Sequence, residues 1–311
     1  MRWWRGLDNT PADWHGGVVT IGFFDGVHLG HRKIIGRAVA RARALDVPSL
    51  VLTFDPHPGE VLRPGSHPAL LTTLRHKTEL LDALGVDALC VQPFSLGFSE
   101  IPADEFVTKI LVETLRAKVV VIGQNFSYGH RAQGRVETLV RAGAQHGFEV
   151  DGVSLLHEDT PGGTPVISST RLRAQVAEGD VAEAALGLGR PHRVEGVVVH
   201  GDARGRSIGF PTANLQVTPW AAIPDDGVYA GYAGWAGRRQ PAAISIGTNP
   251  TFAGRERRVE AFLLDFDGDL YGEYMAFEFA GRLRATLKFS SVEELVAQMT
   301  LDVTATRTAT T

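Results

Sequence analysis

The stretch TIGFFDGVHLGH (residues 20–31) lies where an apolar, β-branched run changes into a helical pattern. The run VVTIGFF (18–24) leads into it, and HRKIIGRAVARARAL (31–45) follows with apolar residues at helical spacing. A strand that turns directly into a helix is the first half of a βαβ unit, so the stretch predicts a parallel sheet. Ligands of such sheets bind beyond the carboxyl ends of the strands, which is where this turn would lie.

Strand and helix patterns go on alternating up to about residue 156. The predicted strands are 49–54, 86–92, 118–123 and 148–156, and the predicted helices are 74–85, 102–115 and 136–147. Regular alternation of this kind indicates βαβ units, with helices that cover both faces of the sheet. A short helical stretch at 169–187 ends this part of the chain, and we place a domain boundary near residue 187.

The chain changes in character after that boundary. From residue 193 to about 287, short strands alternate with glycine-rich turns, which is typical of an antiparallel barrel or sandwich. A final helix is expected over 290–299, with Ser290 as its N-cap and Glu293 three residues later. The terminal TATRTATT is expected to be disordered.

Composition argues against several classes of function. The 311 residues contain 31 Lys plus Arg against 35 Asp plus Glu, so there is no basic footprint for nucleic acid. No stretch reaches the roughly 18 apolar residues of a membrane span, and the charged, proline-containing N-terminus does not resemble a signal peptide. The single cysteine, Cys90, cannot form an intramolecular disulfide and is expected in the core. These features predict a cytoplasmic protein that binds neither nucleic acid nor membrane.

The opening stretch also carries a pattern suited to phosphate. The turn after the first strand delivers a helix N-terminus to the ligand crevice, where free backbone N–H groups and the helix dipole favour anions. Gly22 and Gly30 let the backbone approach a ligand closely. His28 and His31 would share one helix face and donate hydrogen bonds to a phosphoryl group in transfer. The alternative is a pair of surface histidines that cap the helix, which would leave the glycines unexplained.

The run GFFDGVHLGH resembles the H-x-G-H signature of nucleotidyltransferases, in the version found in bacterial bifunctional riboflavin kinase/FAD synthetases. Later adenylyltransferase motifs of that family are similar to TFDPHP (53–58), GQNFSYGH (123–130) and ISSTRLR (167–173). Motifs of its riboflavin kinase module are similar to GRSIGFPTANL (205–215), GVYAG (227–231), SIGTNPTF (245–252) and VEAFLLDFDGDLYGE (259–273). The resemblance covers nearly the whole chain, and the motifs stand in the family's order.

The resemblance implies a fold and an activity for each half. Residues 1–186 would form a Rossmann-like nucleotidyltransferase domain with a parallel sheet, acting as an FMN adenylyltransferase. Residues 187–311 would form an antiparallel β-barrel riboflavin kinase domain with a terminal helix. Together they would phosphorylate riboflavin to FMN with ATP and Mg²⁺. They would then join FMN to the AMP moiety of ATP, which releases pyrophosphate and gives FAD.

Site residues of the first domain are carried over from the matching motifs. His28 and His31 would be catalytic, holding ATP phosphates and stabilising the transition state at the α-phosphorus. No side-chain nucleophile is needed, because the attacking FMN phosphate is already ionised. Asn125 would bind the flavin substrate. The remaining ATP and phosphate contacts implied here are Gly22, Phe24, Gly30, His57, Ser169, Thr170 and Arg173.

Riboflavin offers a primary alcohol, so the second domain needs a base and a metal ion. Glu260, in a strand expected to be largely buried, matches the family's catalytic glutamate; a salt-bridged structural glutamate is the alternative. Thr212 and Asn214 would ligate Mg²⁺ together with ATP phosphate. The other implied contacts are Gly201, Gly205 and Gly209 for the nucleotide and Arg284 for the flavin.

Other functions stay open at this stage. A nucleotidyltransferase with a non-flavin substrate would account for the first half of the chain but leaves residues 193–290 unexplained. A flavin-binding regulator without catalysis would lack Glu260 or the histidine pair, and both are present. The expected partners are the small molecules riboflavin, FMN and ATP, and a weak homo-oligomer is compatible with the sequence.

Overall fold

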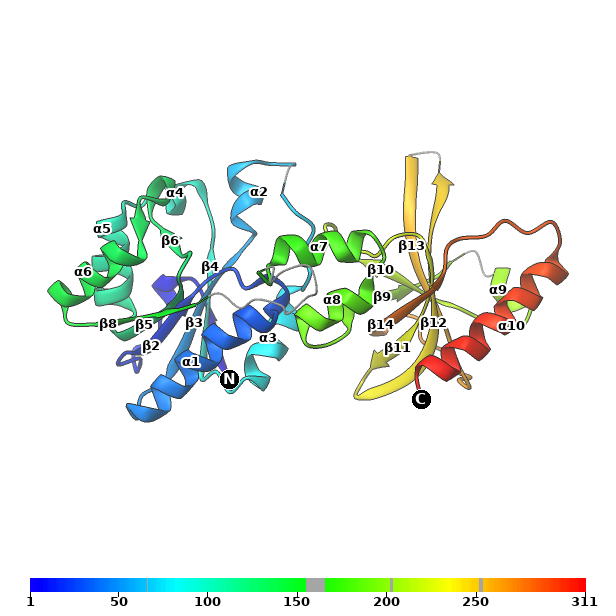
Figure 1. Cartoon of the computed structure of the whole chain (residues 1–311), viewed down its shortest axis with the longest axis horizontal. Coiled ribbons are helices and arrows are strands. Elements are labelled where there is room, and N and C mark those ends of the chain that lie inside the picture. Colours follow the sequence, from blue (N-terminus) through cyan, green and yellow to red (C-terminus); the bar gives the residue numbers. More distant parts are fainter. Residues whose placement is uncertain (66, 155–165, 202–203, 252–253) are drawn as a thin grey trace. The chain divides into compact units, whose positions relative to one another are not determined.

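The computed structural model describes the chain except residues 66, 155–165, 202–203 and 252–253 (Figure 1). The described residues form two compact units. The first unit contains Met1–Pro68 and Leu74–Ser168, and the second unit contains Ala69–Thr73 and Ser169–Thr311. Each unit has its own sheet and its own hydrophobic core.

A six-stranded parallel sheet forms the middle of the first unit, which confirms the predicted fold class. Its strands are β1 (Arg2–Arg5), β2 (Gly17–Ile21), β3 (Ser49–Asp55), β4 (Ala88–Pro93), β5 (Ala117–Gly123) and β8 (Glu149–Val153). Their order is β1-β4-β3-β2-β5-β8. The chain runs outward from β2 to β3 and β4 and then returns to the other side of β2 with β5. The order therefore switches between β2 and β5, which is where such sheets bind ligands.

The sheet differs from the sequence-based expectation at both edges. The sequence pattern did not predict β1, because four residues are too short for periodicity to register. It pairs with β4 and buries Trp4, whose ring packs 5.8 Å from that of Trp14. At the opposite edge β8 ends at Val153, so the predicted strand 148–156 is shorter; its residues 155 and 156 lie outside the described residues.

Helices cover both faces of this sheet, as the alternation predicted. α1 (Leu29–Ala44) and α3 (Leu74–Ala83) pack on one face, where Val51 of β3 joins their core cluster. The π-helical segment η3 (Phe106–Thr114) and α6 (Val136–His146) pack on the other face with Leu50 and Leu52. Successive residues of β3 therefore point to opposite helical layers.

The first unit also contains short elements that connect the strands and helices. They are η1 (Leu7–Asn9), η2 (Asp25–Val27), α2 (Pro58–Leu62), α4 (Leu96–Ser99), α5 (Ala103–Glu105), η4 (His130–Ala132) and the strand pair β6 (Ser127–Tyr128) and β7 (Gly134–Arg135).

The second unit is built on a closed antiparallel barrel with the order β10-β13-β12-β11-β14-β9. The barrel strands are β9 (His192–Val199), β10 (Ala213–Val217), β11 (Gly227–Trp235), β12 (Arg238–Thr251), β13 (Gly254–Leu263) and β14 (Tyr274–Arg284). Closure satisfies the backbone groups that an open sheet would leave at its edges. The structure thus decides for a barrel between the two architectures that the sequence left open.

The helices of the second unit pack against this barrel. α7 (Ser169–Ala177) and α8 (Val181–Leu188) form a pair, and Val181 of α8 joins the hydrophobic cluster of the barrel. α9 (Arg204–Ser207) is a single short turn before β10. The helical stretch that precedes the predicted boundary is therefore grouped with the barrel by its contacts. The division of the two activities at residues 186 and 187 stays a prediction.

The C-terminal helix is longer than predicted, and the expectation of a disordered tail is wrong. α10 runs from Val292 to Ala309 and includes most of TATRTATT. Its N-cap is Ser291 rather than Ser290, because Ser291 Oγ accepts a hydrogen bond from the Glu294 N–H at 3.2 Å. The last turns are held to the barrel by an ion pair between Arg307 and Asp265. Composition alone does not reveal such a tertiary contact.

Candidate active sites

The turn from β2 to α1 lies at the switch point of the parallel sheet. It contains η2, and its backbone has positive φ angles at Phe24 (52°), Gly26 (80°) and Val27 (39°). Residues with side chains seldom adopt this left-handed conformation, and a β-branched residue such as valine does so least readily. Phe24 and Val27 are buried, so packing around the turn holds the unusual backbone in place.

His28 and His31 come together at the start of α1. His28 is the N-cap, and its Nδ1 accepts a hydrogen bond from the backbone N–H of His31 at 3.3 Å. The two rings stack with their centroids 3.6 Å apart. Because Nδ1 is an acceptor, the proton of neutral His28 lies on Nε2, which makes that nitrogen a donor. The two imidazoles therefore lie together, as the spacing predicted, with His28 at the N-cap position directly before the helix.

Gly22 and Gly30 leave space for the side chains of this turn. A Cβ on Gly30 would lie 3.1 Å from Cε1 of His28, and a Cβ on Gly22 would lie 2.9 Å from the ring of Phe24. Phe24 itself packs edge-on against the His31 ring, with centroids 5.3 Å apart. These three residues therefore shape the surroundings of the histidine pair, and their contact with ATP stays a prediction.

His57 lies at the carboxyl end of β3, on the same edge of the sheet as the turn. It is the N-cap of α2, and its Nδ1 accepts a hydrogen bond from the Gly59 N–H at 2.9 Å. Its ring packs edge-on against Phe23, the residue that precedes the left-handed turn, with centroids 4.4 Å apart.

The other predicted residues of the adenylyltransferase site come from two places. Asn125 is exposed in the turn after β5, the strand next to β2. Ser169, Thr170 and Arg173 lie in the first turns of α7, which belongs to the second unit. Their action on the same ATP molecule as the histidine pair stays a prediction.

Glu260 lies in a row of polar residues across three strands of the barrel. The register pairs Glu260 of β13 with Asn214 of β10 on one side and with Ser245 of β12 on the other. Residues directly opposite in antiparallel strands share a face. Val259 and Ala261 are buried in the barrel core, so Glu260 points to the outer face, where it is half-buried. The expectation of a largely buried strand therefore holds only for alternate residues.

Two cavities of the second unit meet at this row. The polar cavity, with a volume of about 460 Å³, is named for Thr212, Asn214, Asp267 and Asp269. Gly201, Gly205 and apolar residues such as Leu263, Phe266 and Leu270 also line it. The apolar cavity, with a volume of about 500 Å³, is lined by residues that include Phe210, Glu260, Phe262, Arg284, Phe289 and Met299. Thr212 lines both cavities, and its Oγ1 donates a hydrogen bond to Oε2 of Glu260 at 3.2 Å.

The glycines predicted to contact the nucleotide play different structural parts. A Cβ on Gly201 would lie 2.6 Å from Nδ2 of Asn214, and a Cβ on Gly205 would lie 2.2 Å from the carbonyl oxygen of Phe210. Both glycines therefore permit close packing in the wall of the polar cavity. Gly209 has a φ of 87°, which favours glycine, but it does not belong to the described lining of that cavity.

The polar cavity offers hard oxygen ligands but no complete cage for a metal ion. No group of three or more His, Cys, Asp or Glu residues that could hold a metal occurs in the described part of the chain. Thr212 supplies a hydroxyl, and Asn214 supplies a carboxamide oxygen. Mg²⁺ is commonly bound by few protein ligands, because it keeps several waters and takes substrate phosphate oxygens. The residues present therefore fit an ion that arrives with a nucleotide.

Arg284 lines the apolar cavity as part of an ion pair that the sequence reasoning missed. Its Nε lies 2.9 Å from Oδ1 of Asp302 and its Nη2 lies 2.6 Å from Oδ2, and Asp302 is buried on α10. Ser245, opposite Glu260, was also missed. The only sequence signal for Asp302 was an acidic residue beside the apolar Met299 and Val303 of the same helix.

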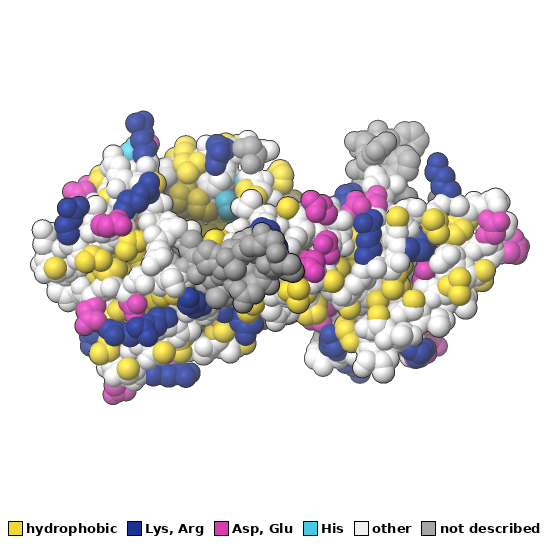
Figure 2. Space-filling view, in the orientation of Figure 1, with side chains coloured by type: hydrophobic (Ala, Val, Ile, Leu, Met, Phe, Trp, Pro, Cys, Tyr) yellow, Lys and Arg dark blue, Asp and Glu magenta, His cyan; other side chains and the backbone are white. Residues whose placement is uncertain are grey.

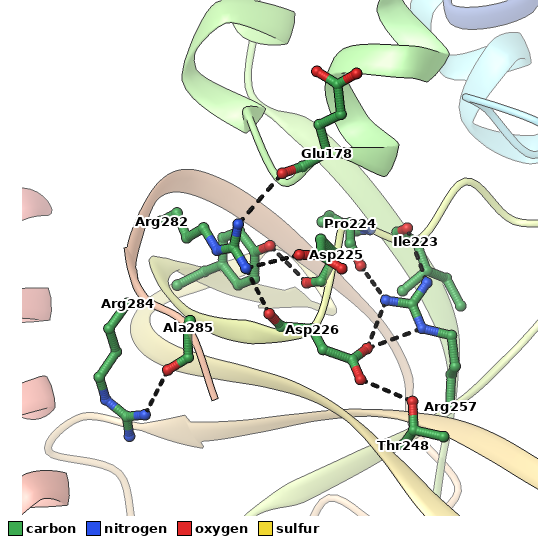
Figure 3. Close-up of polar contacts among 11 residues, drawn as sticks. Glu178, Ile223, Pro224, Asp225, Asp226, Thr248, Arg257, Arg282, Arg284 and Ala285 are labelled. Atoms are coloured by element: carbon green, nitrogen blue, oxygen red, sulfur yellow. Dashed lines mark hydrogen bonds and ion pairs between the residues drawn. The ribbon is translucent and has the colours of Figure 1, made fainter. Parts of the chain in front are cut away.

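Arg257 fixes the loop before β11 to the barrel (Figure 3). It donates to the carboxylate of Asp226 at 2.9 Å and to the carbonyl oxygens of Ile223 and Pro224. The same carboxylate accepts a hydrogen bond from Oγ1 of Thr248 at 2.8 Å. Thr248 of β12 and Arg257 of β13 are directly opposite each other. Thr248 is three residues after Ser245, and Arg257 is three residues before Glu260. This network therefore supports the strand pair that carries the polar row.

The face shown in Figure 2 carries acidic and basic side chains interspersed. Among the described helices, none combines the length and the apolar character needed to cross a membrane. Cys90 is fully buried in β4, which confirms its expected place in the core, and desolvation raises the pKa of its thiol to about 12.

Comparisons with known families divide the chain into two consecutive matches. A family model described as FAD synthetase matches residues 10–171, and one described as riboflavin kinase matches residues 188–310.

Individual relatives are similar over nearly the whole chain. A protein of Escherichia coli (strain K12), named bifunctional riboflavin kinase/FMN adenylyltransferase, is 38% identical over 305 residues, which cover 97% of this chain and 96% of the relative. A protein of the same name from Listeria monocytogenes serovar 1/2a is 40% identical over 292 residues, which cover 93% of this chain and 91% of the relative. A solved structure named macrolide-efflux protein from Streptococcus pneumoniae has a TM-score of 0.88 at 33% identity and covers 99% of each chain.

Proposed function

The chain belongs to the bifunctional riboflavin kinase/FMN adenylyltransferase family, and from this premise we propose how its two sites work. The enzyme phosphorylates riboflavin to FMN and adenylylates FMN to FAD, with ATP as the co-substrate of both steps. Similarity to relatives with both activities supports this function over a nucleotidyltransferase with a non-flavin substrate. We assign adenylylation to residues 1–186 and phosphorylation to 187–311, a division supported by the gap between the two family matches.

In the kinase site Glu260 acts as the base. It accepts the proton of the riboflavin 5′-hydroxyl while that oxygen attacks the γ-phosphorus of ATP, and ADP leaves. The observation that carries this proposal is the position of Thr212, which lines both cavities and donates to Glu260. The polar cavity suits a nucleotide and the apolar cavity suits an aromatic flavin ring. The hydroxyl and the phosphate would therefore meet beside Glu260.

Thr212 and Asn214 would hold Mg²⁺ at the polar cavity with the phosphates of ATP. When bound, this ion neutralises charge that develops on the transferring phosphoryl group. Arg284 would contact the flavin, and Asp302 orients its guanidinium through two hydrogen bonds. Gly201, Gly205 and Gly209 are assigned to the loop that closes over the nucleotide.

In the adenylyltransferase site an oxygen of the FMN phosphate attacks the α-phosphorus of ATP, and the bond to the bridging oxygen breaks to release pyrophosphate. His28 and His31 donate hydrogen bonds to the phosphoryl oxygens, where negative charge builds up in the transition state. The donor character of His28 Nε2 supports this role, because Nδ1 is occupied as an acceptor. Asn125 would contact FMN, with further ATP and phosphate contacts from Gly22, Phe24, Gly30, His57, Ser169, Thr170 and Arg173.

The direct test is product analysis by chromatography after incubation of the protein with riboflavin, ATP and Mg²⁺. We expect FMN to appear first and FAD to follow at its expense. Omission of Mg²⁺ should prevent formation of FMN. FMN without FAD would overturn the adenylyltransferase assignment, and consumption of ATP without FMN would overturn the kinase assignment.

We also place the enzyme in the cytoplasm, where a single unpaired thiol such as Cys90 remains reduced. Weak self-association stays open and is checked by light scattering over a range of protein concentrations.

A further inference from the structure

A lysine is buried beside the adenylyltransferase turn, although none of the motifs includes it. Lys77 lies on α3 and is 2% exposed. Its Nζ donates a hydrogen bond to the carbonyl oxygen of Phe23 at 2.6 Å and lies 3.8 Å from the centre of the Phe23 ring. Phe23 is the residue directly before the left-handed turn that leads to His28. A buried charge of this kind is costly unless it is paired, so its position calls for an explanation.

We propose that Lys77 is a positioning residue for adenylyl transfer, which holds the β2–α1 turn so that His28 and His31 keep their catalytic placement. The proposal rests on the function assigned above to the histidine pair.

Two donors from different elements converge on the Phe23 carbonyl. Besides Lys77, the hydroxyl of Thr53 donates to the same oxygen at 3.1 Å. Thr53 is fully buried on β3, the strand that neighbours β2 in the sheet. A carbonyl oxygen has two lone pairs, and both donors can therefore be accommodated. The start of the turn is thus tied to a helix on one face of the sheet and to the strand alongside.

The conformation of the turn explains why such a tie is needed. Phe24 and Val27 have positive φ angles. Both residues could adopt backbone conformations with negative φ at a lower energy. Sparsely populated backbone conformations persist only where surrounding contacts over-determine them. The turn from Phe23 to His28 is six residues long, so a relaxed backbone would move the histidine cap and the stacked ring of His31.

Two carboxylates near Lys77 stabilise its buried ammonium group. Desolvation lowers the pKa of Lys77 to about 8, while the carboxylates of Asp25 and Asp55 raise it. Asp25 is itself buried and lies within the turn. The ammonium therefore contacts the turn through a hydrogen bond at Phe23 and attracts it through the charge of Asp25. A methionine would fill the same space without either interaction.

The experiment compares Lys77→Met with Lys118→Met, an exposed lysine of β5 outside both sites. With FMN and ATP supplied, Lys77→Met should lower kcat for FAD formation by about a hundredfold, the scale expected when reacting groups are slightly misplaced. KM for FMN should change little, because the lysine contacts no substrate, and the variant should remain folded. Lys118→Met should match the unchanged protein. A folded Lys77→Met variant with normal kcat, or with a raised KM alone, overturns the proposal.

A second pair of variants keeps the test decisive if Lys77→Met does not fold. Thr53→Val removes the other donor to Phe23 while keeping the shape of the side chain, and Thr53→Ser keeps the hydroxyl. We expect a lower kcat for FAD formation in Thr53→Val and recovery in Thr53→Ser; equal rates in both would overturn the proposal. His31→Ala is measured alongside. Normal adenylylation in His31→Ala would contradict the function of the histidine pair, whereas a normal Lys77→Met beside an inactive His31→Ala contradicts only the role of Lys77.

Discussion

Arg282 of β14 donates a hydrogen bond from Nη1 to the carbonyl oxygen of Glu178 at 3.3 Å, which ties the barrel to the end of α7 (Figure 3). The same guanidinium donates to Oδ2 of Asp225 at 2.8 Å and to the carbonyl oxygen of Asp226 at 2.7 Å. Val181, on the helix that follows, is 1% exposed within the barrel's hydrophobic cluster. The compact unit that contains the barrel therefore begins before residue 187.

Fragments that start at Ser169 and at residue 187 should both phosphorylate riboflavin, but with different stability. The shorter fragment lacks Val181 and Glu178, which is one of the three acceptors of Arg282. Loss of one buried valine costs about 2 kcal/mol, so its melting temperature should be lower by several degrees. Both fragments lack Ala69–Thr73, so that omission cancels in the comparison. Equal melting temperatures would show that α7 and α8 do not stabilise the barrel, and a folded longer fragment that makes no FMN would contradict the kinase assignment.

Glu260→Gln should lower kcat for FMN formation by about a hundredfold, because the amide keeps the size of the side chain and removes its basicity. KM for riboflavin should change much less, since the lost interaction acts mainly in the transition state. FAD formation from supplied FMN serves as the internal control and should be unchanged.

A structural role for Glu260 would give the opposite result. The variant would then have a lower melting temperature and normal kinase turnover in the folded fraction. Measurement of the melting temperature and both activities on this one variant separates the two roles.

His28→Asn distinguishes catalysis from helix capping. Asparagine is a good N-cap, so it can accept the hydrogen bond that His28 now accepts from the His31 N–H. The helix and the melting temperature should therefore be preserved, while FAD formation falls by about a hundredfold through loss of a transition-state donor. If the variant kept full adenylylation, the histidine would be a cap and nothing more.

His31→Ala should abolish most FAD formation and leave FMN formation intact. One donor to the transition state is worth on the order of a hundredfold in turnover. Assays with riboflavin and with FMN as separate substrates check this in the same preparation. An equal loss of both activities in a folded variant would mean that the two sites are not separable in the way proposed.

Lys77 should make stability depend on pH in a predictable direction. Burial lowers its pKa from 10.5 to about 8, so between these values the unfolded chain binds a proton that the folded chain does not. The free energy of unfolding should therefore rise with pH above about 8. Below pH 8 the lysine is charged in both states, and the full cost of burying that charge lowers the free energy of unfolding. Denaturant unfolding of the unchanged protein and Lys77→Met over this range should show the rise only in the former. A parallel pH dependence in both proteins would contradict the buried ammonium.

Local sequence patterns predicted the strands and helices that have clear periodicity. β2, α1 and β3 follow directly from apolar spacing, and the change of texture after residue 187 predicted an all-β second half. The tail was predicted wrongly, because threonine-rich composition suggests disorder while Arg307 is held by Asp265 on the barrel. The N-cap was misplaced by one residue, since Ser290 and Ser291 are both suitable caps by type.

The sequence by itself determined the motifs from which the site residues are proposed, because motif residues are close in the chain and their chemical types are specific. Tertiary structure alone decided their neighbours. Nothing in the sequence shows that Lys77 donates a hydrogen bond to Phe23, 54 residues earlier in the chain. Nor does the sequence show that Ser245 and Asn214 lie on either side of Glu260. Strand register and helix packing depend on contacts between distant residues, and single-sequence periodicity carries information only about which face of its own element a residue occupies.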